Sequence, residues 1–257
     1  MPPKPQFIVP CPRPKRLLKK KPRMTFIAGF NCRDGIVLCA DQLETDGVTR
    51  RYRCKLEGVE MNNTWAVSWA GAGDAHIIDK FTDKLKQSLA NLNEFDRAQI
   101  ELAAEAALTL IDQDHHAGQA IQVIAGLWSK PIARSGRWTV AQRRLYRGRS
   151  DNQCIAKEAE YCLAGMDVTL AEFILRNTFK SGQTTVDEAM RLGVFITALM
   201  KEYADGVGGE TDVMAYRTGG ADWEGYTQAE VAAIEAEIPI EEVGRLVSDY
   251  LSAKLRK

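Results

Sequence analysis

The sequence lacks a long apolar run near its start, and its cysteines lack the spacings of a metal site. The longest apolar run of the first 23 residues is Phe7–Pro10, far shorter than a secretory leader or a membrane span. No cysteine pair has the CxxC spacing, and no histidine stands at zinc-site distance from a cysteine. Most cysteines have apolar neighbours, so we expect reduced, buried thiols in a cytoplasmic protein. The six are Cys11, Cys32, Cys39, Cys54, Cys154 and Cys162.

Acidic residues are absent from the first 23 positions, which hold eight lysines and arginines. The whole chain has 34 basic and 34 acidic residues, so the remainder carries a net charge of −8. The same segment holds seven of the nine prolines, which exclude a regular helix and favour an extended, solvated chain. We expect residues 1–24 to be a basic extension or propeptide and residues 25–257 to form a single domain.

Strands and helices are expected in blocks along the rest of the chain. Alternating apolar residues around an Asp-Gly turn predict strands first, and two amphipathic stretches predict helices after them. The expected strands are 25–32 and 35–42, 52–59 and 64–71, 120–129, 137–148, 159–166 and 211–218. The expected helices are 73–92, 95–116, 168–179, 185–204 with a cap from Thr185 to Glu188, and a polar C-terminal segment. This block order favours an α+β stack of antiparallel sheets between helical layers.

Thr25 stands where the basic segment gives way to alternating apolar sequence. A threonine hydroxyl is a weak nucleophile unless a base takes its proton, and the residue's own free α-amine serves when the threonine comes first. Two routes would expose that amine: translation from Met24 followed by methionine removal, or cleavage of residues 1–24 as a propeptide. Thr25 is therefore a candidate N-terminal nucleophile.

A cation near such an amine would keep it neutral, as a base must be, because the ordinary pKa of an α-amine is about 7.7–8.0. Lys55, in the third predicted strand, is the candidate for this role. Asp41 ends the second predicted strand and is a candidate to hold the lysine in place. The nucleophile, the cation and the carboxylate would then come from three adjacent strand ends.

The spacing of these residues resembles that of proteasome-type peptidase subunits of the N-terminal-nucleophile hydrolase superfamily. Asp41 follows Thr25 by sixteen residues, and DQLETDG fits the family pattern D-x-x-x-T-x-G through Thr45 and Gly47. Three further landmarks follow in order: Lys55–Leu56 for the family's lysine strand, WAGAGDA at 69–75 for its strand-to-helix turn, and TVDEA at 185–189 for a later helix. The resemblance extends from residue 25 to about residue 218.

The resemblance implies a four-layer αββα fold and a threonine-type peptidase. Thr25 would be the nucleophile and, through its amine, the general base. Lys55 would tune that amine, and Asp41 would pair with Lys55. A backbone N–H at Ala70 or Gly71 would stabilise the oxyanion, which is commonly worth roughly 3 kcal/mol per donor.

The same resemblance implies the surroundings of the site. Thr45 and Gly47 would border a groove in which a peptide adds as an extra strand. The family chemistry requires no cofactor and no metal. The resemblance implies a peptide or unfolded-protein substrate and a homo-oligomeric assembly. It leaves open an ATP-dependent unfoldase as a partner, and it implies neither nucleic acid nor membrane.

Departures from the family pattern keep other functions open. A family serine aligns with Met166, and in a later Asp-x-x-Ser-Gly pattern Asp205 is kept, as possible support for the site, while Gly208 replaces the serine. Met24 stands where autoprocessed subunits have glycine, which favours methionine removal. One alternative is a noncatalytic proteasome-like scaffold subunit, and another is an amidase or transpeptidase that acts on a different amide.

Two other patterns are interpreted as structural. His115 and His116 follow Asp112 and Asp114 at an expected helix end, where charged residues commonly cap and solvate, so we expect no metal. GAGDAH at 71–76 lacks the third glycine of a dinucleotide loop, and the sequence contains no GK[ST]. We expect no nucleotide site there.

Overall fold

The fold is taken from a computed structural model of the chain, and the description covers most of residues 25–245. The described residues are 25–45, 50–61, 64–92, 94–114, 120–131, 133–134, 137–138, 141–165, 168–218, 223–239, 242–243 and 245. The predicted N-terminal extension, Gly47, Met166 and the pair His115–His116 all lie outside these residues.

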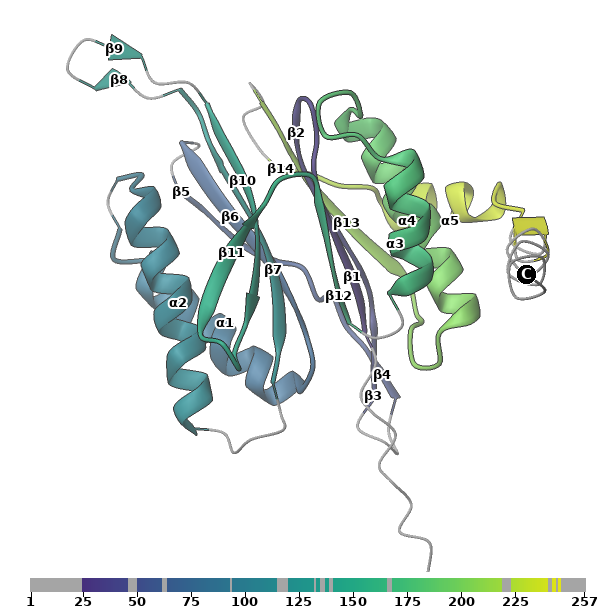
Figure 1. The fold of residues 1–257 in the computed structure, drawn as a ribbon, viewed down its shortest axis with the longest axis horizontal. Helices are drawn as coiled ribbons and strands as arrows, with labels where there is room; N and C mark the ends of the chain where they lie inside the picture. The colour runs from purple at the N-terminus through teal and green to yellow at the C-terminus, as the bar shows by residue number, and fades with distance from the viewer. Residues whose placement is uncertain are drawn as a thin grey trace, which may run out of the picture.

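Two antiparallel five-stranded sheets lie face to face between layers of helices (Figure 1). The first sheet has the order β12-β1-β2-β13-β14. Its strands are β1 (Phe26–Asn31), β2 (Gly35–Asp41), β12 (Tyr161–Gly165), β13 (Thr211–Arg217) and β14 (Trp223–Glu224). The predicted turn joins β1 to β2, and the Cys32 N–H donates to the Gly35 carbonyl across it at 2.9 Å. Because β1 and β2 are antiparallel neighbours, the residue before β1 and the last residue of β2 lie together at one end of the sheet.

The second sheet has the order β11-β10-β7-β6-β5. Its strands are β5 (Glu57–Met61), β6 (Trp65–Ala72), β7 (Gln122–Ser129), β10 (Gln142–Arg149) and β11 (Cys154–Glu158). The sequence prediction missed β11, because this edge strand is mostly exposed and its residues lack apolar alternation. Apolar side chains from both sheets, among them Ile27, Leu38 and Ile124, form the core between them.

Helices cover the outer face of each sheet (Figure 1). On the second sheet lie α1 (Ala75–Leu89) and α2 (Arg97–Asp114), and on the first lie α3 (Thr169–Thr178), α4 (Val186–Tyr203) and α5 (Gln228–Ala236). The predicted cap of α4 is confirmed: Thr185 and Glu188 form a reciprocal capping box. The four-layer arrangement expected from the resemblance is therefore present.

Two short hairpins complete the fold. They are β3 (Leu43–Thr45) with β4 (Arg50–Tyr52), and β8 (Ala133–Arg134) with β9 (Arg137–Trp138). The predicted strand 52–59 is wrong, because β4 ends at Tyr52, β5 begins at Glu57, and residues 53–56 form a connector. Lys55 and Leu56 are both buried, and Leu56 packs into the core between the sheets. Because the connector is not a strand, the side chains of Lys55 and Leu56 need not point to opposite faces of a sheet. The Lys55 side chain is directed to Asp41.

The cysteines are only partly as expected. Cys32, Cys39 and Cys162 are buried free thiols, whereas Cys54 and Cys154 are exposed free thiols. Cys11 lies outside the described residues. In the described part of the chain, no helix is both long and apolar enough to cross a membrane.

Candidate active site

The three predicted catalytic residues meet at one end of the first sheet. Thr25 directly precedes β1, Asp41 is the last residue of β2, and Lys55 comes from the connector between β4 and β5. All three are buried, with exposed fractions of 8%, 0% and 7%. The prediction of three adjacent strand ends is thus correct for Thr25 and Asp41 and wrong for Lys55, which lies in a connector.

The Lys55 ammonium group has an acceptor for each of its three protons. Its Nζ donates to Thr25 Oγ1 at 2.8 Å, to Asp41 Oδ1 at 2.7 Å and to the Leu43 carbonyl at 2.7 Å. Three acceptors around one nitrogen match the donors of a protonated lysine. The geometry thus places the lysine as a hydrogen-bond donor to Thr25 Oγ1.

The Asp41 carboxylate holds four donors and connects separate parts of the chain. Oδ1 accepts from Lys55 Nζ and from the Phe26 N–H at 2.9 Å. Oδ2 accepts from the Gly208 N–H at 3.0 Å and the Leu43 N–H at 3.2 Å. This fully buried carboxylate thereby fixes the start of β1, the start of β3 and the loop after α4. The sequence analysis named Gly208 only as the position of a missing serine, and it did not assign the Leu43 carbonyl to the site.

Electrostatics at the site are dominated by the burial of Lys55. Burial lowers the pKa of its ammonium group below the ordinary value, and the charge and hydrogen bond of Asp41 offset part of this effect. Because Lys55 donates to Oγ1, the hydroxyl proton of Thr25 is directed to another acceptor. A charged donor on Oγ1 also favours the alkoxide that forms when that proton leaves.

Gly165, the last residue of β12, lies against the backbone of Thr25. Its φ is +114°, and a Cβ at this position would lie 1.8 Å from the Thr25 carbonyl oxygen. Only glycine adopts this backbone conformation readily and leaves room for the contact. The sequence analysis did not assign Gly165 a role, although a glycine at a strand end is a known sign of close backbone approach.

Gly165→Ala is expected to lower the free energy of unfolding by about 3 kcal/mol, since it combines a disfavoured φ with overlap on a main-chain atom. Urea unfolding of the variant and the parent measures this loss. Gly182→Ala is the matched control, because a Cβ there meets no atom within 4 Å and its φ lies outside the disfavoured region. Equal losses in the two variants would contradict the close approach at Thr25.

The remaining predicted residues have different places relative to Thr25. Ala70 and Gly71 lie in β6, where Ala70 packs between the sheets and Gly71 contacts Ile78 of α1. Thr45 ends β3, which pairs with β4. Asp205 is exposed in the loop after α4, and this loop reaches the site through the backbone of Gly208 rather than through a hydroxyl.

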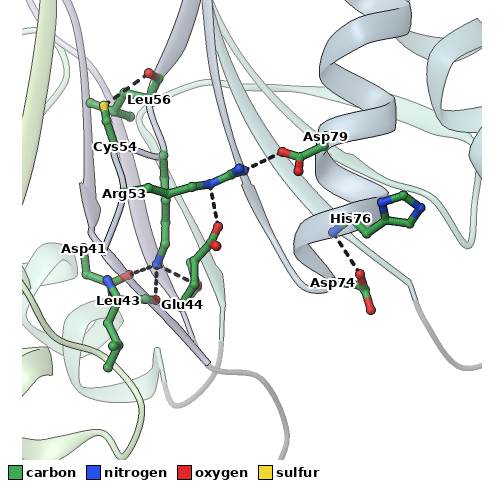
Figure 2. A network of polar contacts seen from close by, with 11 residues as sticks. Asp41, Leu43, Glu44, Arg53, Cys54, Leu56, Asp74, His76 and Asp79 are labelled. Carbon is green, nitrogen blue, oxygen red and sulfur yellow. Dashed lines mark hydrogen bonds and ion pairs between the residues drawn. The ribbon is translucent and has the colours of Figure 1, made fainter. Parts of the chain in front are cut away.

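Charged residues flank the site on the solvent side. Figure 2 shows Arg53 between Glu44 of β3 and Asp79 of α1. Asp41 and Leu43, which accept hydrogen bonds from Lys55, are in the same view. Sequence reasoning missed this group, because the three residues come from separate elements and Glu44 occupies a variable position of the DQLETDG pattern.

Metal ligands are not gathered in the described part of the chain, where no cluster of three or more His, Cys, Asp or Glu residues could hold an ion. The chemistry available at the site is that of a hydroxyl supported by a lysine and a carboxylate. Such a site can form an ester with an acyl group.

Comparison with known proteins yields structural matches alone. No family model and no curated protein matches the sequence. A Gly-1 mutant of Anbu from Hyphomicrobium sp. strain MC1 matches with a TM-score of 0.68 at 15% identity, over 91% of this chain and 97% of that one. The chain has the Anbu fold. Anbu from Yersinia bercovieri, an ancestral beta-subunit, gives a TM-score of 0.68 at 14% identity, over 88% of this chain and 96% of that one.

A third Anbu structure, the helical assembly of the Anbu complex from Pseudomonas aeruginosa, has a TM-score of 0.65 at 14% identity. The match covers 89% of this chain and 96% of that one. Identities of 14–15% show a shared fold and nothing finer. The predicted α+β architecture and the structural resemblance to a proteasome-type subunit are confirmed.

Proposed function

We propose that this chain is a threonine-type peptidase with Thr25 as its nucleophile. The observation that carries the proposal is the 2.8 Å hydrogen bond from Lys55 Nζ to Thr25 Oγ1, with Asp41 behind the lysine. An ordinary structural threonine has no need of a buried ammonium group, which is costly to bury unless it is paired. A noncatalytic subunit could keep the Asp41–Lys55 pair for stability, but it would have no chemical reason to direct the ammonium group to Thr25 Oγ1.

Hydrolysis would begin when the free α-amine of Thr25 takes the proton from Oγ1. The oxygen then attacks the carbonyl carbon of the peptide bond, and the resulting oxyanion is stabilised by a backbone N–H at Ala70 or Gly71. As the C–N bond breaks, the amine returns the proton to the leaving group and an ester remains on Thr25. A water molecule, deprotonated by the same amine, hydrolyses the ester.

Lys55 would contribute through its charge at two points. It stabilises negative charge on Oγ1 during attack, and as a nearby cation it keeps the Thr25 amine neutral at physiological pH. A peptide would lie as an added strand along β3, bordered by Thr45 and Gly47. Among the described strands, β3 pairs with β4 alone. The Leu43 N–H and carbonyl are already bonded to the Gly208 carbonyl and to Lys55 Nζ, so the peptide would add beside Thr45.

We further propose that the chain works as a homo-oligomer, as the helical assembly of the Anbu complex suggests by analogy of fold. Enclosure would restrict substrates to peptides or unfolded chains, and an ATP-dependent unfoldase would widen that range. The rival function is a noncatalytic scaffold. It is favoured by Gly208, which brings a backbone N–H to the site where the family pattern has a serine.

The test begins with the intact mass and N-terminal sequence of protein purified after expression of the full reading frame. We expect a chain that starts at Thr25, hydrolysis of a panel of N-acetylated fluorogenic peptides, and a single ester on Thr25 after treatment with a β-lactone acylating agent. A chain that retains residues 1–24 and neither cleaves the peptides nor forms the ester would overturn the proposal and favour the scaffold.

A further inference from the structure

Arg53, in the connector that carries Lys55, joins two elements that are separate in the sequence, β3 and α1. Its Nε lies 2.6 Å from Glu44 Oε1 in β3, and its Nη2 lies 2.6 Å from Asp79 Oδ1 in α1 (Figure 2). The exposed fractions of the side chains are 41% for Arg53, 18% for Glu44 and 50% for Asp79. We call these three residues the Arg53 bridge.

Each end of the Arg53 bridge is next to a group of the candidate active site. Glu44 follows Leu43, whose carbonyl accepts a hydrogen bond from Lys55 Nζ. Asp79 follows Ile78, and the Ile78 side chain packs against Gly71 so closely that a Cβ on that glycine would lie 2.7 Å from it. A shift of β3 relative to α1 would therefore change the position of Lys55 relative to that of the proposed oxyanion donors.

We propose that Arg53 is a positioning residue, which sets the spacing between β3 and α1 and thereby the geometry in which a peptide lies over Thr25. The inference rests on the proposed peptidase function. Without the guanidinium group, Glu44 and Asp79 would be two like charges facing each other, and their repulsion would separate the two elements. Because the Arg53 bridge is partly exposed, salt weakens it; the screening length is roughly 10 Å at 0.1 M ionic strength.

The first measurement is steady-state hydrolysis of an uncharged N-acetylated peptide by the parent and by Arg53→Gln. We expect KM to rise about fivefold or more in the variant while kcat stays within about twofold. Raising salt from 0.05 to 0.5 M should raise the KM of the parent by weakening the Arg53 bridge, and lower the KM of the variant by screening the repulsion between Glu44 and Asp79. The matched control is Arg176→Gln, which breaks the exposed 2.9 Å pair of Arg176 with Glu172 on α3 and should change neither constant.

A triple variant separates positioning from general damage. Adding Glu44→Gln and Asp79→Asn to Arg53→Gln removes the repelling charges, so it should recover much of the lost affinity. No such recovery is expected if Arg53→Gln simply loosens the local fold. If Arg53→Gln had the same KM as the parent and the same dependence of KM on salt, the inference would be overturned and the peptidase function would stay intact.

Hydrogen exchange tests the Arg53 bridge even if no peptide is cleaved. In Arg53→Gln the amides of residues 43–45 and 75–79 should exchange faster than in the parent, and in Arg176→Gln they should not. Unchanged exchange in both variants would overturn the proposed spacing role. If the parent hydrolysed no peptide but the amides of Arg53→Gln exchanged faster, the peptidase proposal would be contradicted. The structural role of the Arg53 bridge would still be supported.

Discussion

Thr25→Ala is expected to lower kcat/KM for peptide hydrolysis by roughly a thousandfold or more, as removal of a covalent nucleophile does in other hydrolases. The variant keeps Lys55 and Asp41 but lacks the oxygen that would form the ester. Thr25→Ser should retain measurable activity, because it keeps an Oγ for Lys55 to bond. Initial rates on the best N-acetylated peptide, measured over a range of concentrations, give the comparison.

The fold should survive this substitution. Lys55 loses one of three acceptors but keeps Asp41 and the Leu43 carbonyl. An unmade hydrogen bond at a buried donor costs about 1–3 kcal/mol, and more when the donor is charged. Circular dichroism and elution volume should therefore match the parent. If Thr25→Ala, with its chain starting at residue 25, kept undiminished turnover, Thr25 would not be the nucleophile. The amide-cleaving site would then lie elsewhere.

Local sequence patterns predicted the parts of this fold that local physics decides. The Asp-Gly turn between β1 and β2 and the capping box at Thr185 depend on residues close in sequence, so both could be recognised without coordinates. The pairing of Thr25, Asp41 and Lys55 came from spacings typical of a known family. Its hydrogen bonds now agree with that expectation, although the catalytic roles remain a proposal.

Features set by tertiary contacts were not predictable in the same way. The four polar bonds of Asp41 include an N–H from Gly208, 167 residues away. The family pattern marks this position through a serine side chain, and it does not indicate a backbone N–H bond to Asp41. Lys55 was placed in a strand because its neighbours alternate, whereas the need to reach Asp41 takes residues 53–56 out of the sheet. Tertiary demands thus override local propensity at the site.

Asp41→Ala is the second large effect that we expect, and it acts on stability. Removing the carboxylate leaves the Lys55 ammonium group, whose side chain is 5% exposed, without its charged partner. It also takes the acceptor from the N–H groups of Phe26 and Gly208, whereas the Leu43 N–H keeps the Gly208 carbonyl at 2.9 Å. Breaking one side of a buried ion pair typically costs about 3–5 kcal/mol, which is the expected loss in the free energy of unfolding.

Urea unfolding at pH 7.5 measures the loss, with Asp187→Ala as the control. Asp187 pairs with Arg217 but is 68% exposed, so its removal should cost under about 1 kcal/mol. Asp41→Asn should fall between the two, because the amide keeps one oxygen for the backbone donors and loses the charge that Lys55 needs. If Asp41→Ala cost no more than Asp187→Ala, the carboxylate would not be the anchor described above.

The pH dependence of that loss separates the charge of Asp41 from its hydrogen bonds. Burial lowers the pKa of Lys55 below its ordinary value of 10.5, and Asp41 raises it in part, so Asp41→Ala should lower it further. Between the folded and the unfolded pKa the unfolded chain binds more protons, and stability rises with pH. This window reaches lower pH in the variant, so its deficit relative to the parent should narrow from pH 7 to pH 10. A constant deficit would mean that Asp41 stabilises the fold through its bonds to backbone N–H groups and not through Lys55.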